Sequence, residues 1–154
     1  MYFEYCVIIV IGDLMEEYVN KIIELAKIAY TNDDIPVGAI IVKDNKIIGE
    51  GFNTRNSFKS VIGHAEISAI EMACKYVSDW RLDDCEMYIT LYPCLMCTGA
   101  IIESRIRKIY YLCDRTNVRF KYDNFIEIEK IENELKKSEY MLLLQSFFEN
   151  KRNN

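Results

Sequence analysis

Hydrophobic residues recur along the chain at two different spacings, and the change between them marks out the secondary structure. From Met15 to Tyr30 the apolar residues fall on one face at the three- and four-residue spacing of an amphipathic helix. Residues 36–42 form an apolar, β-branched run, and after a polar turn the chain returns through residues 46–52. This pattern predicts a β-hairpin after the first helix.

The rest of the chain alternates between helical and strand-like segments. Helical spacing recurs over residues 64–77, 94–104 and 132–151, and short apolar runs predict strands at 87–91, 108–113 and 125–131. A charged loop is expected at 114–124. This order of elements predicts one α/β domain over residues 1–154, with helices on both faces of a central mixed sheet in three layers.

The first 14 residues allow two interpretations. The apolar run from Cys6 to Ile11 is too short to span a bilayer and lacks the cationic start of a secretion signal. It is either an added N-terminal strand or translated upstream sequence, because Met15 would make a suitable start for the first helix. Residues 1–14 are therefore treated as a possible N-terminal extension.

Composition limits the class of protein further. Hydrophobic residues make up 51% of the chain, which excludes extensive disorder and provides for a real core. The formal net charge is −5, from 19 basic and 24 acidic residues, which argues against binding to polyanions such as RNA unless a local basic surface exists. Without a signal or a membrane span, we expect a cytoplasmic protein, no membrane partner, and reduced thiols at the scattered cysteines.

The chain contains a single histidine, His64, and two residues later comes Glu66. Thirty residues on, the segment Pro-Cys-x-x-Cys supplies Cys94 and Cys97. Zinc prefers nitrogen and sulfur ligands in tetrahedral geometry, so the histidine and the two cysteines would fill three positions and leave the fourth for water. His-x-Glu followed by Pro-Cys-x-x-Cys is the signature of zinc-dependent base deaminases. The sequence therefore predicts one catalytic Zn²⁺ per chain, with Glu66 as the residue that carries protons.

Both halves of this motif precede a predicted helix. Ligands at a helix N-terminus benefit from the positive end of the helix dipole, which favours the thiolate form of cysteine. Two alternatives remain open at this point. Cys-x-x-Cys alone also occurs in redox pairs, and Cys74 or Cys113 could close a purely structural four-ligand site.

Beyond the metal motif, the chain resembles the bacterial tRNA adenosine deaminase family, within the wider cytidine and deoxycytidylate deaminase fold. The resemblance runs from Met15 to Cys113 and is carried by residues 35–39, 49–55, 64–66, 81–82, 88–91, 93–97 and 99–106, with a further likeness over 144–152. It implies a three-layer α-β-α cytidine-deaminase-like domain, a homodimer, and a tRNA anticodon loop as substrate.

The resemblance also implies substrate contacts. Asn53 would hydrogen-bond the target nucleoside, Val37 would pack on the base, and the backbone of Ala65 would contact the base edge. Other roles are open for two of them, because Val37 suits an ordinary strand core and an asparagine at a strand end is common in turns.

The chain departs from the family pattern near the expected substrate side. Tyr92 stands where the family generally has glutamate before Pro-Cys, and Asp114-Arg115 inverts the usual Arg-Asp order in a loop that here lacks glycine. These changes leave a small nucleobase substrate, taken as a free base, nucleoside or nucleotide of a base such as guanine or cytosine, as the alternative. A third hypothesis, a zinc-stabilised partner subunit without activity, is disfavoured because Glu66 is present.

A basic run could support the RNA hypothesis. Six basic residues fall within seventeen positions, and we expect them to form one phosphate-binding patch: Arg105, Arg107, Lys108, Arg115, Arg119 and Lys121. The alternative is an ordinary solvated face.

Overall fold

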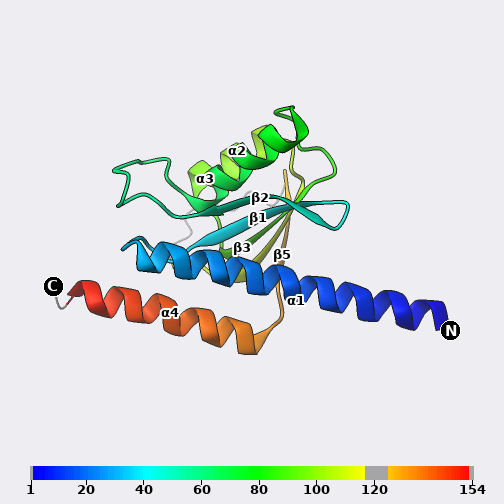
Figure 1. The fold of residues 1–154 in the computed structure, drawn as a ribbon, viewed down its shortest axis with the longest axis horizontal. Helices are drawn as coiled ribbons and strands as arrows, with labels where there is room; N and C mark the ends of the chain where they lie inside the picture. Colours follow the sequence, from blue (N-terminus) through cyan, green and yellow to red (C-terminus); the bar gives the residue numbers. More distant parts are fainter. Residues whose placement is uncertain (1, 117–124, 153–154) are drawn as a thin grey trace.

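A five-stranded mixed sheet lies at the centre of the chain, with two helices on each face (Figure 1). The computed structural model describes residues 2–116 and 125–152, with side chains described from residue 12 onward. The elements in chain order are α1 (Tyr2–Thr31), β1 (Gly38–Lys43), β2 (Lys46–Phe52), α2 (Ala65–Val77), β3 (Glu86–Leu91), α3 (Leu95–Glu103), β4 (Lys108–Cys113), β5 (Glu127–Lys130) and α4 (Glu134–Arg152). The predicted three-layer α/β architecture is confirmed.

The N-terminal segment differs from the sequence-based expectation. Helix α1 begins at Tyr2, so the run from Cys6 to Ile11 is helical and the prediction of an added strand is wrong. A continuous apolar run has no periodicity that separates helix from strand. Here it directly precedes a strong amphipathic helix, and extending an existing helix costs far less than starting a new element. Part of the predicted loop, residues 117–124, lies outside the described residues.

The sheet topology gathers several strand ends at one edge. The strand order is β2-β1-β3-β4-β5; β1 is antiparallel to β2 and β3, whereas β3, β4 and β5 are parallel. The register pairs Gly38 with Phe52 and Leu91 with Cys113. The start of β1 and the ends of β2, β3 and β4 therefore lie together. This edge is where an open α/β sheet offers a crevice for a ligand.

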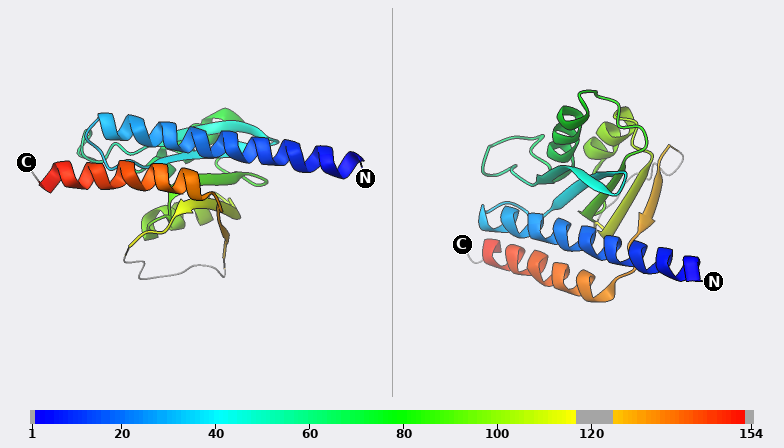
Figure 2. Two further views of the ribbon diagram at one scale, coloured as in Figure 1. Left: turned by 90° about the horizontal axis from the view of Figure 1, so that it is seen from below. Right: turned by 45° about the vertical axis from the view of Figure 1, so that its right-hand side comes forward.

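Two apolar layers hold the helices against the sheet. One lies between the sheet and the pair α2 and α3, and includes the fully buried Ile89, Ile101 and Ile109. The other lies between the sheet and the pair α1 and α4, where Tyr140 of α4 is completely buried and donates a hydrogen bond of 2.9 Å to the carbonyl of Pro36. Figure 2 shows α1 and α4 side by side, running in the same direction. No helix within the described residues combines the length and apolar character that crossing a bilayer would need.

Close approach between α2 and β2 depends on a residue without a side chain. A Cβ placed at Gly51 would lie 2.0 Å from the carbonyl oxygen of Ala65 and 2.7 Å from the backbone nitrogen of Ala69. Since both neighbours are backbone atoms, they cannot rotate away. Gly51 therefore fixes how near the first turn of α2 lies to the sheet.

We predict that Gly51→Ala destabilises the protein by about 1–3 kcal/mol, the usual cost of overpacking a dense interior. Chemical denaturation would measure the loss. The matched control is Gly12→Ala, because a Cβ at Gly12 meets nothing within 4 Å and alanine favours a helix. Equal stability of the Gly51→Ala variant and the wild type would contradict the tight contact.

Candidate metal centre and substrate pocket

Two of the predicted zinc ligands occupy the residue immediately before a helix. His64 precedes α2 and Cys94 precedes α3, and both have extended backbone angles. Neither side chain caps its helix, which leaves the imidazole and the thiol available for another partner. Cys97 lies in the first turn of α3 and is fully buried. The sequence predicted this placement, at the positive ends of two helices where thiolates are favoured.

The three donor atoms lie at distances that suit a tetrahedral metal. The Nδ1 atom of His64 is 3.6 Å from the Sγ of Cys94 and 3.4 Å from the Sγ of Cys97, and the three donors lie within 4.8 Å of one another. Ideal zinc bond lengths and angles require roughly 3.6 Å between nitrogen and sulfur. The residues therefore fit a zinc ion by both chemistry and spacing.

A closed structural site is not supported. Within the described residues, the group of possible ligands contains only His64, Cys94 and Cys97. Cys74 lies near the opposite end of α2, where its thiol contacts the carbonyl of Trp80 at 3.6 Å, and Cys113 is a buried strand residue outside the cluster. Three protein ligands leave a coordination position open, as catalytic zinc sites do.

Electrostatics around the cluster already favour a thiolate. The hydrogen bond from the Cys97 thiol, together with one to His64, lowers the pKa of Cys94 to about 3. The same contact with Cys94, and burial, raise the pKa of Cys97. The pair of cysteines thus shares one negative charge before any cation arrives, which favours capture of a divalent metal.

Glu66 is a buried carboxyl group in the first turn of α2, only 4% exposed. Burial raises its pKa, because an apolar surrounding penalises the charged form. A carboxyl group that holds its proton at higher pH than usual is suited to passing protons back and forth. Glu66 and His64 both line the same cavity.

That cavity has a volume of about 460 Å³, within the range of small-molecule sites. The strand ends contribute Val37, Asn53 and Leu91. Val37 and Asn53 are 7% and 5% exposed, so each is buried and faces the cavity. Ala65 is fully buried with its carbonyl against Gly51, and it is not among the residues lining the cavity.

Sequence reasoning missed the contribution of α4 to the cavity. Met141, Leu144 and Phe148 form one wall, although the helix is separated from the metal motif by almost forty residues of sequence. The only available signal was the apolar spacing within 132–151, which indicates a helix face and does not say what that face contacts. Phe148 remains 43% exposed, as expected for a wall that meets a ligand.

Asp34 is a second residue whose role the sequence did not reveal, since it was assigned to a polar turn. Its carboxylate is fully buried and accepts hydrogen bonds from the backbone nitrogens of Asn56 and Ser57, at 2.5 and 3.1 Å, and from the Ser57 hydroxyl at 2.6 Å. The loop that follows Asn53 and leads to His64 is therefore fastened to the end of α1.

We predict that Asp34→Asn lowers the free energy of unfolding by about 1–3 kcal/mol, because an amide cannot accept all three hydrogen bonds and leaves a buried donor unpaired. Hydrogen exchange at residues 54–58 should rise as well. Asp33→Asn is the matched control, since Asp33 pairs with Lys151 at the surface and such pairs contribute little. Similar exchange in the two variants would contradict the fastening role.

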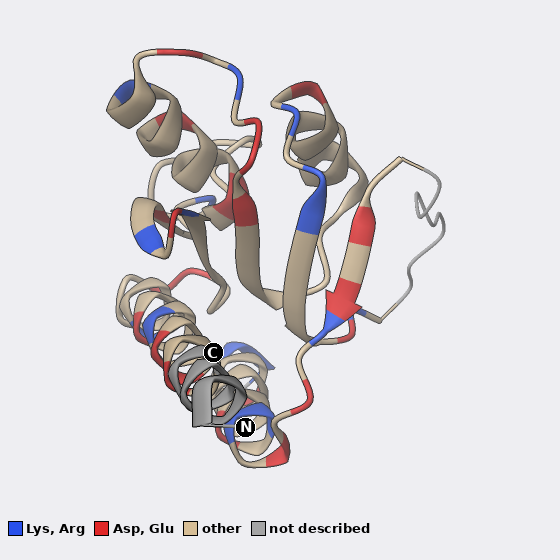
Figure 3. Ribbon diagram, turned by 90° about the vertical axis from the view of Figure 1, so that its right-hand side faces the viewer, with Lys and Arg blue, Asp and Glu red and all other residues tan. Residues whose placement is uncertain are grey.

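The structure does not assemble the predicted basic run into one patch. Lys108 and Cys113 are the two ends of β4, about 16 Å apart along the strand, and Arg115 follows the far end. Lys108 pairs with Glu127 and Glu129 of β5, at 2.9 and 3.2 Å, and Figure 3 shows acidic positions of β5 beside the basic start of β4. Arg119 and Lys121 lie outside the described residues.

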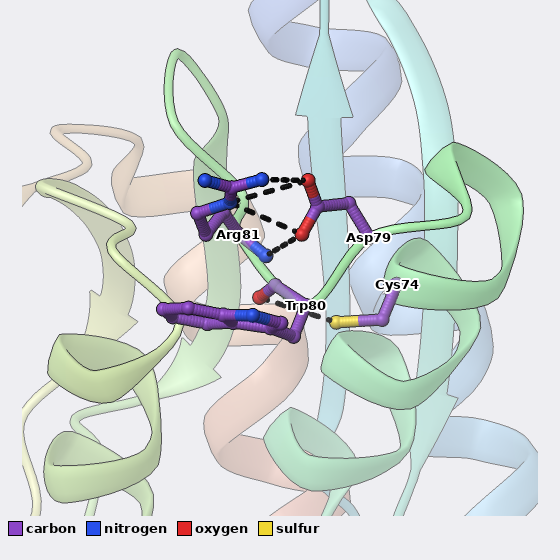
Figure 4. A network of polar contacts seen from close by, with 4 residues as sticks. All are labelled: Cys74, Asp79, Trp80 and Arg81. Atoms are coloured by element: carbon purple, nitrogen blue, oxygen red, sulfur yellow. Dashed lines mark hydrogen bonds and ion pairs between the residues drawn. The ribbon is translucent and has the colours of Figure 1, made fainter.

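Arg105 is also held away from the cavity. Its guanidinium lies 5.3 Å from the ring centroid of Trp80, at the end of α3 opposite the metal ligands. Arg81 approaches the same ring at 5.7 Å and forms an ion pair of 2.8 Å with Asp79, as Figure 4 shows. These contacts join the far ends of α2 and α3, so the expectation of a single phosphate-binding patch is wrong for the described residues.

Comparison with known proteins agrees with this geometry. The zinc-binding region of the cytidine and deoxycytidylate deaminases matches residues 13–113. The chain belongs to the cytidine and deoxycytidylate deaminase family. Family membership and the donor cluster together confirm the prediction of a zinc-dependent deaminase, a hydrolase acting on a C–N bond.

Within this family, the chain is similar to deaminases of particular specificity. A tRNA-specific adenosine deaminase of Buchnera aphidicola subsp. Schizaphis graminum is 37% identical over 145 residues, 89% of this chain and 96% of the relative. A guanine deaminase of Bacillus subtilis is 43% identical over 82 residues, 53% of each chain. A solved structure from work on A-to-I editing at the wobble position of transfer RNA has a TM-score of 0.70 at 30% identity, covering 76% of this chain and 98% of that chain. The cytidine-deaminase-like fold is thereby confirmed.

Proposed function

We propose that this protein deaminates adenosine to inosine at the wobble position of a tRNA anticodon loop. The observation that carries the chemistry is a three-ligand donor cluster beside a buried carboxyl group, both at one cavity. His64, Cys94 and Cys97 are the proposed zinc ligands and Glu66 the proposed catalytic residue. Asn53 and Val37 are the proposed substrate contacts within the cavity, and Ala65 contributes through its backbone.

Zinc supplies Lewis acidity, which lowers the pKa of water enough to make a nucleophile available near neutral pH. The chain's own residues then manage protons and orientation. Glu66 accepts one proton from the attacking water and delivers it to the ring nitrogen. It then transfers the second proton, from the hydroxyl group added to the base, to the amino group, which leaves as ammonia. Its raised pKa brings the proton-holding form closer to neutral pH, where acid and base roles can alternate.

The cavity walls suit a base that has been removed from its stack. Val37, Leu91 and Phe148 offer apolar surfaces to the cavity, while Asn53 supplies a polar group that can both donate and accept hydrogen bonds. A nucleotide in an anticodon loop is unpaired, and extruding it costs less than extracting a base from a duplex.

The choice of tRNA over a free base rests on the extent of similarity. The likeness to a tRNA-specific adenosine deaminase spans 89% of this chain. The alternative, deamination of a free base such as guanine, is favoured by the guanine deaminase relative, although that likeness covers about half of the chain. We further propose that the chain is a single domain, works in the cytoplasm and forms a homodimer.

The decisive experiment offers zinc-loaded protein an anticodon stem-loop RNA with adenosine at the wobble position. We expect inosine, detected by mass spectrometry as the replacement of an amino group by oxygen. The control RNA carries guanosine at that position. Turnover of free guanine without any conversion of the RNA would overturn the substrate proposal and keep the deaminase reaction.

Glu66→Gln tests the proton carrier separately from the metal. Glutamine keeps the size of the side chain but cannot take up a proton, so we expect activity to fall by about 10²–10⁴-fold, the usual contribution of general acid–base catalysis. Zinc content, measured by atomic emission, should stay at one ion per chain. Cys97→Ser is the comparison that should lose zinc, and activity retained by Glu66→Gln would refute the assigned role.

A further inference from the structure

Three exposed charged residues line the cavity, and they differ in whether they form ion pairs or hydrogen bonds within the described residues. Arg55 follows the strand end that supplies Asn53, and Asp114 and Arg115 follow the end of β4. All three line the cavity. Two cations and one anion would leave a weak net charge, so the effect on a ligand depends on which of these groups is already engaged.

Asp114 is engaged by its neighbours. Its Oδ1 atom accepts a hydrogen bond of 3.2 Å from the Tyr111 hydroxyl, and its Oδ2 atom pairs with the ammonium group of Lys130. The ion pair with Lys130, followed by the hydrogen bond from Tyr111, lowers the pKa of Asp114, so it stays ionised and attached to β5. The carboxylate is therefore directed toward its own strand pair, and its charge is compensated there.

Arg55 and Arg115 have no such partner among residues 2–116 and 125–152. Within the described part of the chain, neither guanidinium forms an ion pair or a side-chain hydrogen bond. Both are exposed, and they line the same cavity as the half-buried His64 and the buried Glu66. Two guanidinium groups without a partner in the described part of the chain thus line a cavity of small-molecule size.

We infer that Arg55 and Arg115 form a phosphate-binding pair that selects a phosphorylated substrate over a free base. This inference rests on the proposed function and deepens it by naming the group that the cavity mouth recognises. A guanidinium presents parallel N–H donors that match phosphate oxygens. The phosphates flanking an extruded nucleotide would lie at the rim while the base enters the cavity.

The pair also resolves the conflict between substrate and net charge. A chain with a formal charge of −5 does not attract a polyanion as a whole. Binding therefore requires cations placed where the substrate docks. The basic residues at the start of β4 do not meet this need, because Lys108 is already paired and Arg105 lies over Trp80. Arg55 and Arg115 are at the cavity itself.

The test measures binding of a fluorescent anticodon stem-loop RNA by anisotropy over a range of salt concentrations. Arg115→Gln and Arg55→Gln should each weaken binding about tenfold or more, as expected for loss of a charged hydrogen bond. Each should also reduce the slope of log K against log salt by about 0.7, the value for one phosphate contact on a single strand. Arg115→Lys should keep most of the slope, because it retains the charge.

Arg107→Gln is the matched control, since it removes the same charge from an exposed arginine near the start of β4, away from the cavity. It should leave the slope unchanged. Equal slopes in the Arg115, Arg55 and Arg107 variants would overturn the inference, because the effect would then come from overall charge. Circular dichroism of each variant checks that the fold is intact.

A second arm separates this inference from the proposed function. Zinc-loaded protein is titrated with adenosine, guanosine and their 5′-monophosphates. If no RNA is deaminated but the monophosphates bind more tightly than the nucleosides, and Arg115→Gln removes the difference, the phosphate pair stands and its source is a free nucleotide. If the protein converts RNA yet the arginine variants bind it as the wild type does, the function stands and the pair is refuted.

Discussion

The near contact between α2 and β2 is the constraint on which the site depends. Because Gly51 has no side chain, the carbonyl of Ala65 can lie against the strand, and the first turn of α2 is pressed onto the sheet. His64 and Glu66 flank Ala65 on either side, so their positions follow from that contact. The same strand ends at Phe52, which places the buried Asn53 in the lining of the cavity. The close contact between Gly51 and the backbone of Ala65 therefore fixes both the packing of α2 on the sheet and the positions of His64 and Glu66.

The sequence predicted the metal centre well, because its chemistry is local. His-x-Glu and Pro-Cys-x-x-Cys each fix residue types within a single turn, and the helices that follow them are visible from spacing alone. Only the meeting of the two halves required the fold. That meeting follows from the antiparallel pairing of β1 with both β2 and β3, because β2 and β3 then end at the same sheet edge, where α2 and α3 begin.

The missed features all depend on contacts between distant segments. From the sequence Asp34 is an ordinary turn residue; only the fold brings the backbone of Asn56 and Ser57 against its carboxylate. The apolar spacing of α4 predicts one buried helix face, but it does not show that this face lines the cavity. The prediction of one basic patch was wrong for the opposite reason, because residues close in sequence are kept apart by strand β4. Counting charges within a window of sequence does not show which end of the strand each charge occupies.

The metal ligands and the cavity wall come from separate parts of the chain, and this has a consequence for judging sample quality. All three ligands and the first four strands precede residue 114, whereas Met141, Leu144 and Phe148 belong to the last helix. Protein clipped within α4 would retain every zinc-binding residue and lose one side of the pocket. Metal content would then be a poor measure of active fraction, and an intact-mass measurement should accompany every assay.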